Sequence, residues 1–194
     1  MGDTFNIFLA SILTNNIALV YILGMCPAIG VSKSIRTAVG MGSAVIFVVT
    51  LTSVINWLIY NLFLIPTESE IIALMVFIIT IAATVQFVEM LLEKYIPTLY
   101  MGFGVFLPLI TVNCAVLGVT LFMVLREYTF TQTFFFALGS SVGFFLAITL
   151  VAGIREKLDN IGDIPKGLQG PGIVMIILGI LALGFMGFEG MVAL

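Results

Sequence analysis

The stretch at residues 37–67, TAVGMGSAVIFVVTLTSVINWLIYNLFLIPT, contains no charged residue. A helix needs roughly 20 apolar residues to cross a hydrocarbon core of about 30 Å, because each residue rises about 1.5 Å. The stretch therefore predicts a membrane-spanning helix, with residues left over for tilt or for backbone that is not helical throughout. Strands of a membrane β-barrel are about half as long as such a helix and alternate polar with apolar residues. This stretch is longer and does not alternate.

Six uncharged windows of this kind divide the chain, at 4–32, 37–67, 71–88, 95–125, 128–154 and 167–188. We expect one transmembrane helix in each, and we place these helices near 5–25, 38–64, 71–92, 100–125, 133–153 and 171–192. The sequence thus predicts an all-α integral membrane protein with six transmembrane helices, in a single membrane domain over residues 1–194.

The composition supports this class and excludes several others. Hydrophobic residues make up 61% of the chain and charged residues 9%, whereas an ordinary soluble domain is about 25% charged. A free cytosolic enzyme, a nucleic-acid-binding protein and a disordered linker are therefore excluded. The chain has no histidine, which excludes histidine catalysis and histidine metal ligands, and its two cysteines are too few for a disulfide framework. The first residues, MGDTFNIF, lack the basic region of a cleaved signal peptide.

The lysines and arginines predict the orientation in the membrane. Six of the seven fall on the side reached after the first, third and fifth expected helices: Lys33, Arg36, Lys94, Arg155, Lys157 and Lys166. Only Arg126 falls on the opposite side. Because cytoplasmic loops are enriched in Lys and Arg, we expect the first group in the cytoplasm and both termini outside.

The chain also contains a weak repeat of itself. CPAIGV at 26–31 matches CAVLGV at 114–119, and AVGMG at 38–42 matches ALGSS at 137–141. The two copies belong to units of three expected helices, so the second unit enters the membrane from the opposite face. The sequence therefore predicts two inverted repeats, of about 1–92 and 93–194.

The two cysteines, Cys26 and Cys114, are equivalent residues in this repeat, and each has a proline nearby, Pro27 and Pro108. Proline removes a donor and clashes with the preceding turn, so we expect broken helices near both cysteines. Broken helices at matched positions of two repeats are typical of a binding site. The cysteines could also be inert small hydrophobic residues or, less plausibly inside a bilayer, a disulfide.

As metal ligands, two thiolates do not complete a tetrahedral sulfur site, which needs four. A second copy or another protein must then supply the other pair. A 2Fe-2S cluster held by four cysteines is the natural product of such an arrangement.

Five segments of the chain resemble the A-type membrane component of the Rnf electron-transport complex. They are LGMCPAIGVSK (23–33), VQFVEM (85–90), FLPLITVNCAVLG (106–118), AGIREKL (152–158) and LGFMGF (183–188). The sister family is the E-type component of the sodium-translocating NADH:quinone oxidoreductase, and LREYTF (125–130) is more similar to that component.

This resemblance implies an electron-relay subunit of an ion-translocating oxidoreductase in a bacterial or archaeal cell (inner) membrane. It implies that Cys26 and Cys114 bind one 2Fe-2S cluster together with two cysteines of a homologous inverted partner, the E-type component of Rnf. It implies further components of types B, C, D and G, where FMN, riboflavin and other iron–sulfur clusters are expected. Ferredoxin and NAD bind elsewhere in such a complex, whose electron flow is coupled to Na⁺ or H⁺ transport. No catalytic residue is expected in this chain itself.

Polar residues inside the expected helices are candidates for an ion path: Asn15, Asn16, Glu89, Thr111 and Asn113. Interhelical hydrogen bonding is the alternative for the amides and the hydroxyl, and an interfacial position is the alternative for Glu89. Two other functions fit the pattern less closely. A small secondary transporter shares inverted repeats and broken helices, and a scaffold protein would carry inert cysteines.

Overall fold

The structure is a computed structural model that describes residues 2–65, 72–95, 110–111, 113–161 and 170–187. Every regular element in these ranges is helical. In chain order they are α1 (Gly2–Ile12), α2 (Met25–Val31), α3 (Ile35–Ile59), the π-helical turn η1 (Tyr60–Leu64), α5 (Ala73–Tyr95), α8 (Cys114–Leu125), α9 (Phe130–Ile161) and α10 (Pro171–Met186).

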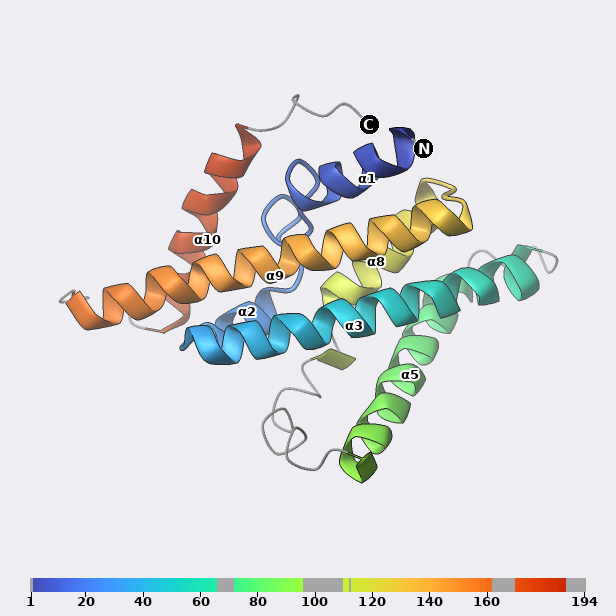
Figure 1. Cartoon of the computed structure of the whole chain (residues 1–194), viewed down its shortest axis with the longest axis horizontal. Helices are drawn as coiled ribbons and strands as arrows, with labels where there is room; N and C mark the ends of the chain where they lie inside the picture. Colours follow the sequence, from blue (N-terminus) through green and yellow to red (C-terminus); the bar gives the residue numbers. More distant parts are fainter. Residues whose placement is uncertain (1, 66–71, 96–109, 112, 162–169, 188–194) are drawn as a thin grey trace.

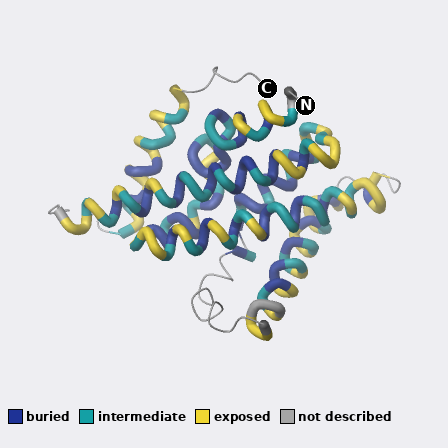
Figure 2. Tube along the Cα trace, in the orientation of Figure 1, coloured by how far each residue is buried: buried dark blue, intermediate teal, exposed yellow. Residues whose placement is uncertain are grey.

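The two longest helices, α3 and α9, lie side by side at the centre and run in opposite directions (Figure 1). The helix α1 lies against α9, α8 contacts both central helices, and α5 packs on α3 and α8. The helix α10 contacts α9 and the short helix α2. Buried residues gather on the facing sides of α1, α3 and α9 (Figure 2). The pair α3–α9 is therefore the frame on which the short helices are placed.

Glycines allow this close packing. Gly42 of α3 lies against the ring of Phe145 in α9, and a Cβ atom there would overlap the ring. Gly139 of α9 lies against the backbone of Phe8 in α1 in the same way. Lipid tails are as apolar as leucine, so helices associate in a membrane through close contact of this kind rather than through the hydrophobic effect.

Three helical stretches in the described ranges are long and apolar enough to span a membrane: Ile35–Leu64, Ala73–Met90 and Phe130–Asn160. Two shorter apolar helices, Cys114–Leu125 and Pro171–Met186, accompany them. Large apolar side chains such as Phe47, Leu62 and Ile79 are exposed on the outer faces, as lipid contact requires. The expectation of a multi-pass, all-α membrane protein is therefore confirmed, while the count of six spans stays a prediction.

The first expected helix, 5–25, is wrong as a continuous element. The helix α1 ends at Ile12, and α2 begins only at Met25. The chain is therefore interrupted close to Cys26, as expected, but not because of Pro27. Proline is the third residue of α2, where its missing N–H would have no partner within the helix. Pro27 therefore lies in the first turn of a helix and does not interrupt one.

The fourth expected helix, 100–125, is described only from residue 110 onward, and Pro108 lies outside the described residues. A helix begins at Cys114, directly after the non-helical residue Asn113. The fifth, 133–153, is confirmed as a helix but is too short, because α9 continues to Ile161. The described part of the chain is interrupted just before both cysteines.

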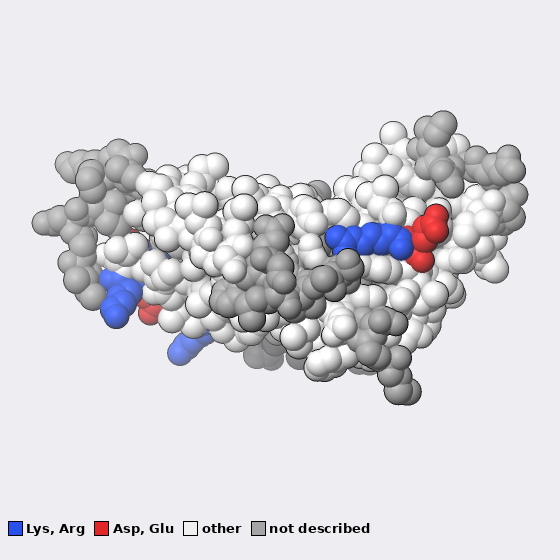
Figure 3. Space-filling model, turned by 90° about the horizontal axis from the view of Figure 1, so that it is seen from above, with Lys and Arg blue, Asp and Glu red and all other residues white. Residues whose placement is uncertain are grey.

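Charged residues gather at the end of the central pair where α3 starts and α9 finishes. The start of α3 and the end of α9 are tied together where the backbone N–H of Ile35 donates to Glu156 Oε2 at 3.0 Å. This brings Lys33 and Arg36 to the same end as Arg155 and Lys157 in the fold. Figure 3 shows one face of the molecule with its described charged side chains towards the two ends and uncharged surface between them.

Candidate cysteine site

The segment before α2 places Cys26. Gly24 has a φ of 84°, in the left-handed region that favours glycine, and the helix starts directly after it. A Cβ atom on Gly24 would also overlap the ring of Phe144 in α9. Ile22 has a φ of 55°, which is strained for a β-branched residue. This unusual backbone turns the chain into α2 and leaves the Cys26 thiol exposed in the first turn.

The segment before α8 places Cys114 by a different device. Asn113 is the N-cap residue, with φ −77° and ψ 114°, and its side-chain oxygen accepts from the N–H of Ala115 at 3.0 Å. Asparagine is among the best N-cap residues, because its oxygen satisfies a backbone N–H that has no helical partner. Cys114 follows as the first helical residue and is partly buried.

The two helix starts meet in space. The backbone N–H of Gly24 donates to the sulfur of Cys114, with a nitrogen–sulfur distance of 2.9 Å, although the residues are 90 positions apart in the chain. Both cysteines thus belong to helix N-termini, where unpaired N–H groups and the helix dipole favour negative charge. This arrangement suits ligation by sulfur as thiolate.

A cavity of about 280 Å³ opens beside Cys114. Its lining is mostly apolar and comes from α5, from the residues before α8 and from the start of α8: Ile78, Ile81, Ala82, Thr111, Asn113, Cys114 and Leu117. Asn113 is 3% exposed, and its side-chain Nδ2 has no hydrogen-bond partner among the described residues. The cavity is therefore lined by Cys114, Asn113 and Thr111 in otherwise apolar surroundings.

The donor set fits half of a sulfur site. No group of three or more His, Cys, Asp or Glu side chains that could hold a metal occurs in the described ranges. Cys26 is exposed, so a neighbouring protein can reach it. Cys26 does not belong to the lining of the cavity beside Cys114, and the printed contact between the two helix starts runs through Gly24. Two thiols in one chain supply half of a four-thiolate site, which another chain would complete.

Among the predicted ion-path residues, the structure groups Thr111 and Asn113 with Cys114 in the cavity. It does not place Asn15, Asn16 or Glu89 in that lining. The oxygen of Asn15 accepts a 3.4 Å hydrogen bond from the hydroxyl of Tyr21. Glu89 is partly buried on α5, two turns beyond Ala82.

Asn16 supports the interrupted first segment. Its Nδ2 donates to the carbonyl oxygens of Ile12 and of Gly143 in α9, at 3.0 and 2.9 Å. Its Oδ1 accepts from the N–H groups of Ala18 and Leu19. Non-helical backbone inside a membrane needs partners from the protein, and this buried side chain supplies them. Asn16 therefore makes hydrogen bonds of the kind that the alternative interpretation requires, and its place in an ion path stays a prediction.

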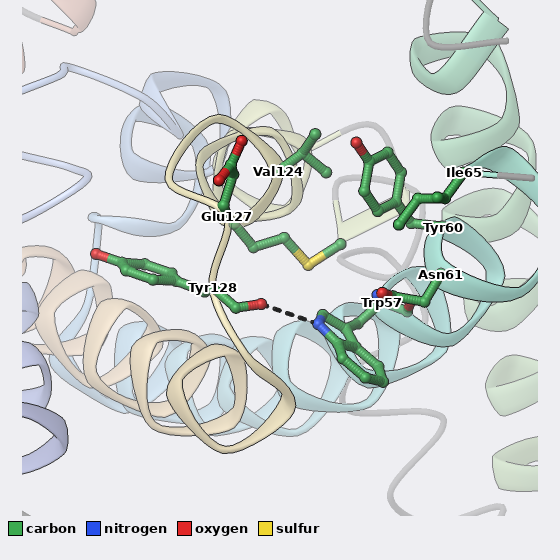
Figure 4. A pocket seen from close by; sticks show the side chains of 8 residues that line it. Trp57, Tyr60, Asn61, Ile65, Val124, Glu127 and Tyr128 are labelled. Carbon is green, nitrogen blue, oxygen red and sulfur yellow. Dashed lines mark hydrogen bonds between the residues drawn. The ribbon is translucent and has the colours of Figure 1, made fainter. Parts of the chain in front are cut away.

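A second cavity, of about 350 Å³, lies at the end of α3 where α8 finishes (Figure 4). Trp57, Asn61 and Glu127 are among its lining residues, and the indole N–H of Trp57 donates to the carbonyl oxygen of Tyr128 at 3.0 Å. Beside it, burial lowers the pKa of Arg126, but the hydrogen bonds and charge interactions with Tyr128 and Tyr21 together outweigh burial and raise the pKa above its ordinary value. Neither cysteine belongs to the lining of this cavity.

Two features of these sites are not visible in the sequence pattern. The pattern shows Gly24 only as a small residue that allows close approach, whereas the fold makes it a donor to Cys114. The second cavity, beside Trp57, is likewise not predicted from the sequence, although Trp57 is the single tryptophan of the chain. The position of a tryptophan near the end of an expected span was the available signal.

Comparison with known proteins shows which family the chain belongs to. Residues 4–192 match the Rnf-Nqr subunit family, described as a membrane protein. The E component of the Na⁺-translocating NADH-quinone reductase of Maridesulfovibrio salexigens is 48% identical over 98% of both chains. The A component of the ion-translocating oxidoreductase complex of Erwinia tasmaniensis is 46% identical over 99% of both chains. The E component of the Methylococcus capsulatus reductase is 49% identical over 95% of this chain and 96% of its own. This chain therefore belongs to the Rnf-Nqr subunit family of membrane proteins.

Proposed function

We propose that the chain is a membrane electron-relay subunit of a redox-driven ion pump, an ion-translocating oxidoreductase. The names of its relatives support this, since they are components of a Na⁺-translocating NADH-quinone reductase and of an ion-translocating oxidoreductase complex. The observation that carries the proposal is the contact between the two cysteine-bearing helix starts, with Gly24 N–H on the sulfur of Cys114.

In this proposal Cys26 and Cys114 supply two of the four thiolates of a 2Fe-2S cluster, and a homologous inverted protein supplies the other two. When bound, such a cluster accepts and releases single electrons. The chain's own residues hold it at one side. The N–H of Gly24 donates to one ligand sulfur, while Ile78 and Ile81 keep the surroundings apolar.

The inverted repeat is part of the same proposal. The order of elements supports it, because a helix with a cysteine in its first turn precedes a long central helix twice, as α2 before α3 and as α8 before α9. The two long helices run antiparallel, as duplicates of a three-helix unit would. We propose six spans, with Lys33 and Arg155 on the cytoplasmic side of the cell inner membrane and both termini outside.

Between the two sister complexes we propose the Rnf type. The alignment to the Erwinia protein spans 192 positions and covers 99% of this 194-residue chain, so it needs almost no gap. The alignment to the Maridesulfovibrio protein spans 200 positions but covers 98% of the chain, so about ten positions are gaps. The identities of 46% and 48% keep the E component of the quinone reductase as the second candidate.

The partners follow from the Rnf assignment. We propose an E-type Rnf partner at the cysteines, together with the components of types B, C, D and G, which would bear FMN, riboflavin and the other iron–sulfur clusters. Ferredoxin and NAD would bind on those components, and membrane lipid would cover the exposed apolar faces. Electron flow would drive Na⁺ or H⁺ transport.

The test replaces each cysteine in the complex, purified through a tag on this chain. Cys26→Ser and Cys114→Ser should each remove two irons per complex and one 2Fe-2S electron paramagnetic resonance signal, because three thiolates hold such a cluster poorly. The flavins of the other components should stay bound. Gly30→Ser is the matched control, because nothing lies within 4 Å of a Cβ atom at that position of α2.

Full iron content and an unchanged signal in either cysteine variant would refute the shared cluster. Substrates separate the two sister complexes. Reduction of NAD⁺ by reduced ferredoxin supports the Rnf type, whereas reduction of quinone by NADH supports the second candidate. A colourless complex without iron would refute both.

A further inference from the structure

Asn113 is oriented by its capping role. Its side chain accepts a hydrogen bond from the N–H of Ala115 at 3.0 Å. Only the oxygen of a side-chain amide can accept, so this bond fixes which end of the amide is Oδ1. The nitrogen Nδ2 must then occupy the other branch of the amide.

That nitrogen is left without a protein partner. Asn113 is 3% exposed, and Nδ2 makes no hydrogen bond to any described residue. A buried donor without a partner is destabilising, because it loses its hydrogen bond to water and gains none in the protein. Serine or aspartate would cap the helix equally well without burying this donor. Capping therefore explains the oxygen of Asn113 and leaves the nitrogen unexplained.

The surroundings of Asn113 point to the kind of partner that is missing. The side chain lines the cavity of about 280 Å³ together with Cys114, next to it in the chain, and the remaining lining is largely apolar. In apolar surroundings a donor gains most from a negatively charged acceptor. Sulfur that ligates iron carries such charge, and the N–H of Gly24 already donates to the Cys114 sulfur.

We propose that Asn113 Nδ2 donates a hydrogen bond to a sulfide of the cluster held by Cys114 and thereby raises the reduction potential. This inference rests on the proposed function. Reduction adds one negative charge to the cluster, so a donor stabilises the reduced form more than the oxidised form. Hydrogen bonds to sulfur are among the factors that set the potentials of iron–sulfur clusters. Asn113 is thus a positioning residue that acts on the potential.

The experiment compares Asn113→Ser with the parent complex. Serine keeps a side-chain oxygen for the Ala115 N–H but has no amide donor. Redox titration followed by electron paramagnetic resonance should show full iron content and a midpoint potential shifted to more negative values. Asn15→Ser is the matched control, because Asn15 does not line the cavity, and its midpoint should not move. An unchanged midpoint in Asn113→Ser with full iron content overturns the inference.

A second measurement does not depend on any variant. The parent complex is labelled with asparagine carrying ¹⁵N only in the side-chain amide, and pulsed electron paramagnetic resonance then measures ¹⁵N coupling to the reduced cluster. We expect a coupling, and its absence overturns the inference. A different result tests the proposed function: if Cys114→Ser keeps the cluster signal, the proposed function is refuted. Loss of the signal in Cys114→Ser without ¹⁵N coupling in the parent refutes only the role of Asn113.

Discussion

The two helices that carry the cysteines differ in how they are held. The helix α8 has 12 residues, and the side chain of Asn113 caps it. The helix α2 has seven residues, and Gly24 at its N-cap offers no side-chain hydrogen bond. Helices shorter than about 12 residues are marginal without tertiary contacts. The local sequence thus supports α8, while the rest of the fold must support α2.

Contacts from α9 supply that support. The ring of Phe144 fills the space next to Gly24. At the other end of α2, the guanidinium of Arg155 donates to the carbonyl oxygen of Ile29 at 3.3 Å and to the hydroxyl of Ser32 at 2.9 Å. The two cysteines are therefore presented at the starts of two helices through different local structures. The comparison predicts that substitutions around α2 disturb the site more than those within α8.

The largest effect is expected for Gly24→Ala. The new Cβ atom would overlap the Phe144 ring, and the left-handed backbone would be strained. Strain and overpacking each cost about 1–3 kcal/mol, so we expect a loss of about 4 kcal/mol in stability. Thermal unfolding in detergent measures this loss. Gly30→Ala in the same helix is the control, and equal melting temperatures for the two variants would contradict the prediction.

Asn16→Ala should have the next largest effect. It removes four hydrogen bonds, including the link from the interrupted segment to Gly143 of α9. Buried backbone groups would be left unpaired, which predicts a loss of about 3 kcal/mol. Thermal unfolding against Asn15→Ala tests this, since Asn15 makes one long hydrogen bond in an exposed position. If Asn16 acted only in ion transport, Asn16→Ala would keep normal stability and lose transport. That result would contradict a stabilising role for Asn16.

Arg155→Ala should loosen the C-terminal end of α2. The side chain is 7% exposed and donates to both Ile29 and Ser32. Loss of hydrogen bonds from a charged group predicts about 2 kcal/mol of destabilisation. Hydrogen exchange of the α2 amides should become faster than in Lys157→Ala, the control two residues away on the same helix. Unchanged exchange in α2 would show that the helix does not need this contact.

The smallest effect is expected within α8, for Gly118→Ala. A Cβ atom there would come within 2.6 Å of the flexible end of the Leu23 side chain and near no backbone. A small shift of that side chain costs little, and alanine gains about 1 kcal/mol of helix propensity over glycine. Stability should change by less than about 1 kcal/mol. A loss as large as that of Gly24→Ala would remove the contrast between the two helices.

The long helices are predictable from sequence because absence of charge over about 20 or more residues is a direct physical requirement of the bilayer. The pattern also predicts an interruption near each cysteine, but it places the first one at Pro27. The actual interruption depends on Asn16 reaching Gly143, a contact between residues 127 positions apart. The unpaired nitrogen of Asn113 is likewise visible only in the structure, because a sequence pattern does not show which atom of a side-chain amide makes a hydrogen bond.

The length of α9 has a mechanical consequence. Its 32 residues form a rod of about 48 Å at 1.5 Å per residue, longer than the hydrocarbon core. It touches α1, α2, α3, α8 and α10 along the way. A tilt of only about 5° around its middle moves each end by about 2 Å over such a length. A rigid tilt of this kind would displace Arg155 together with its hydrogen bonds to Ile29 and Ser32 at the end of the helix that carries Cys26.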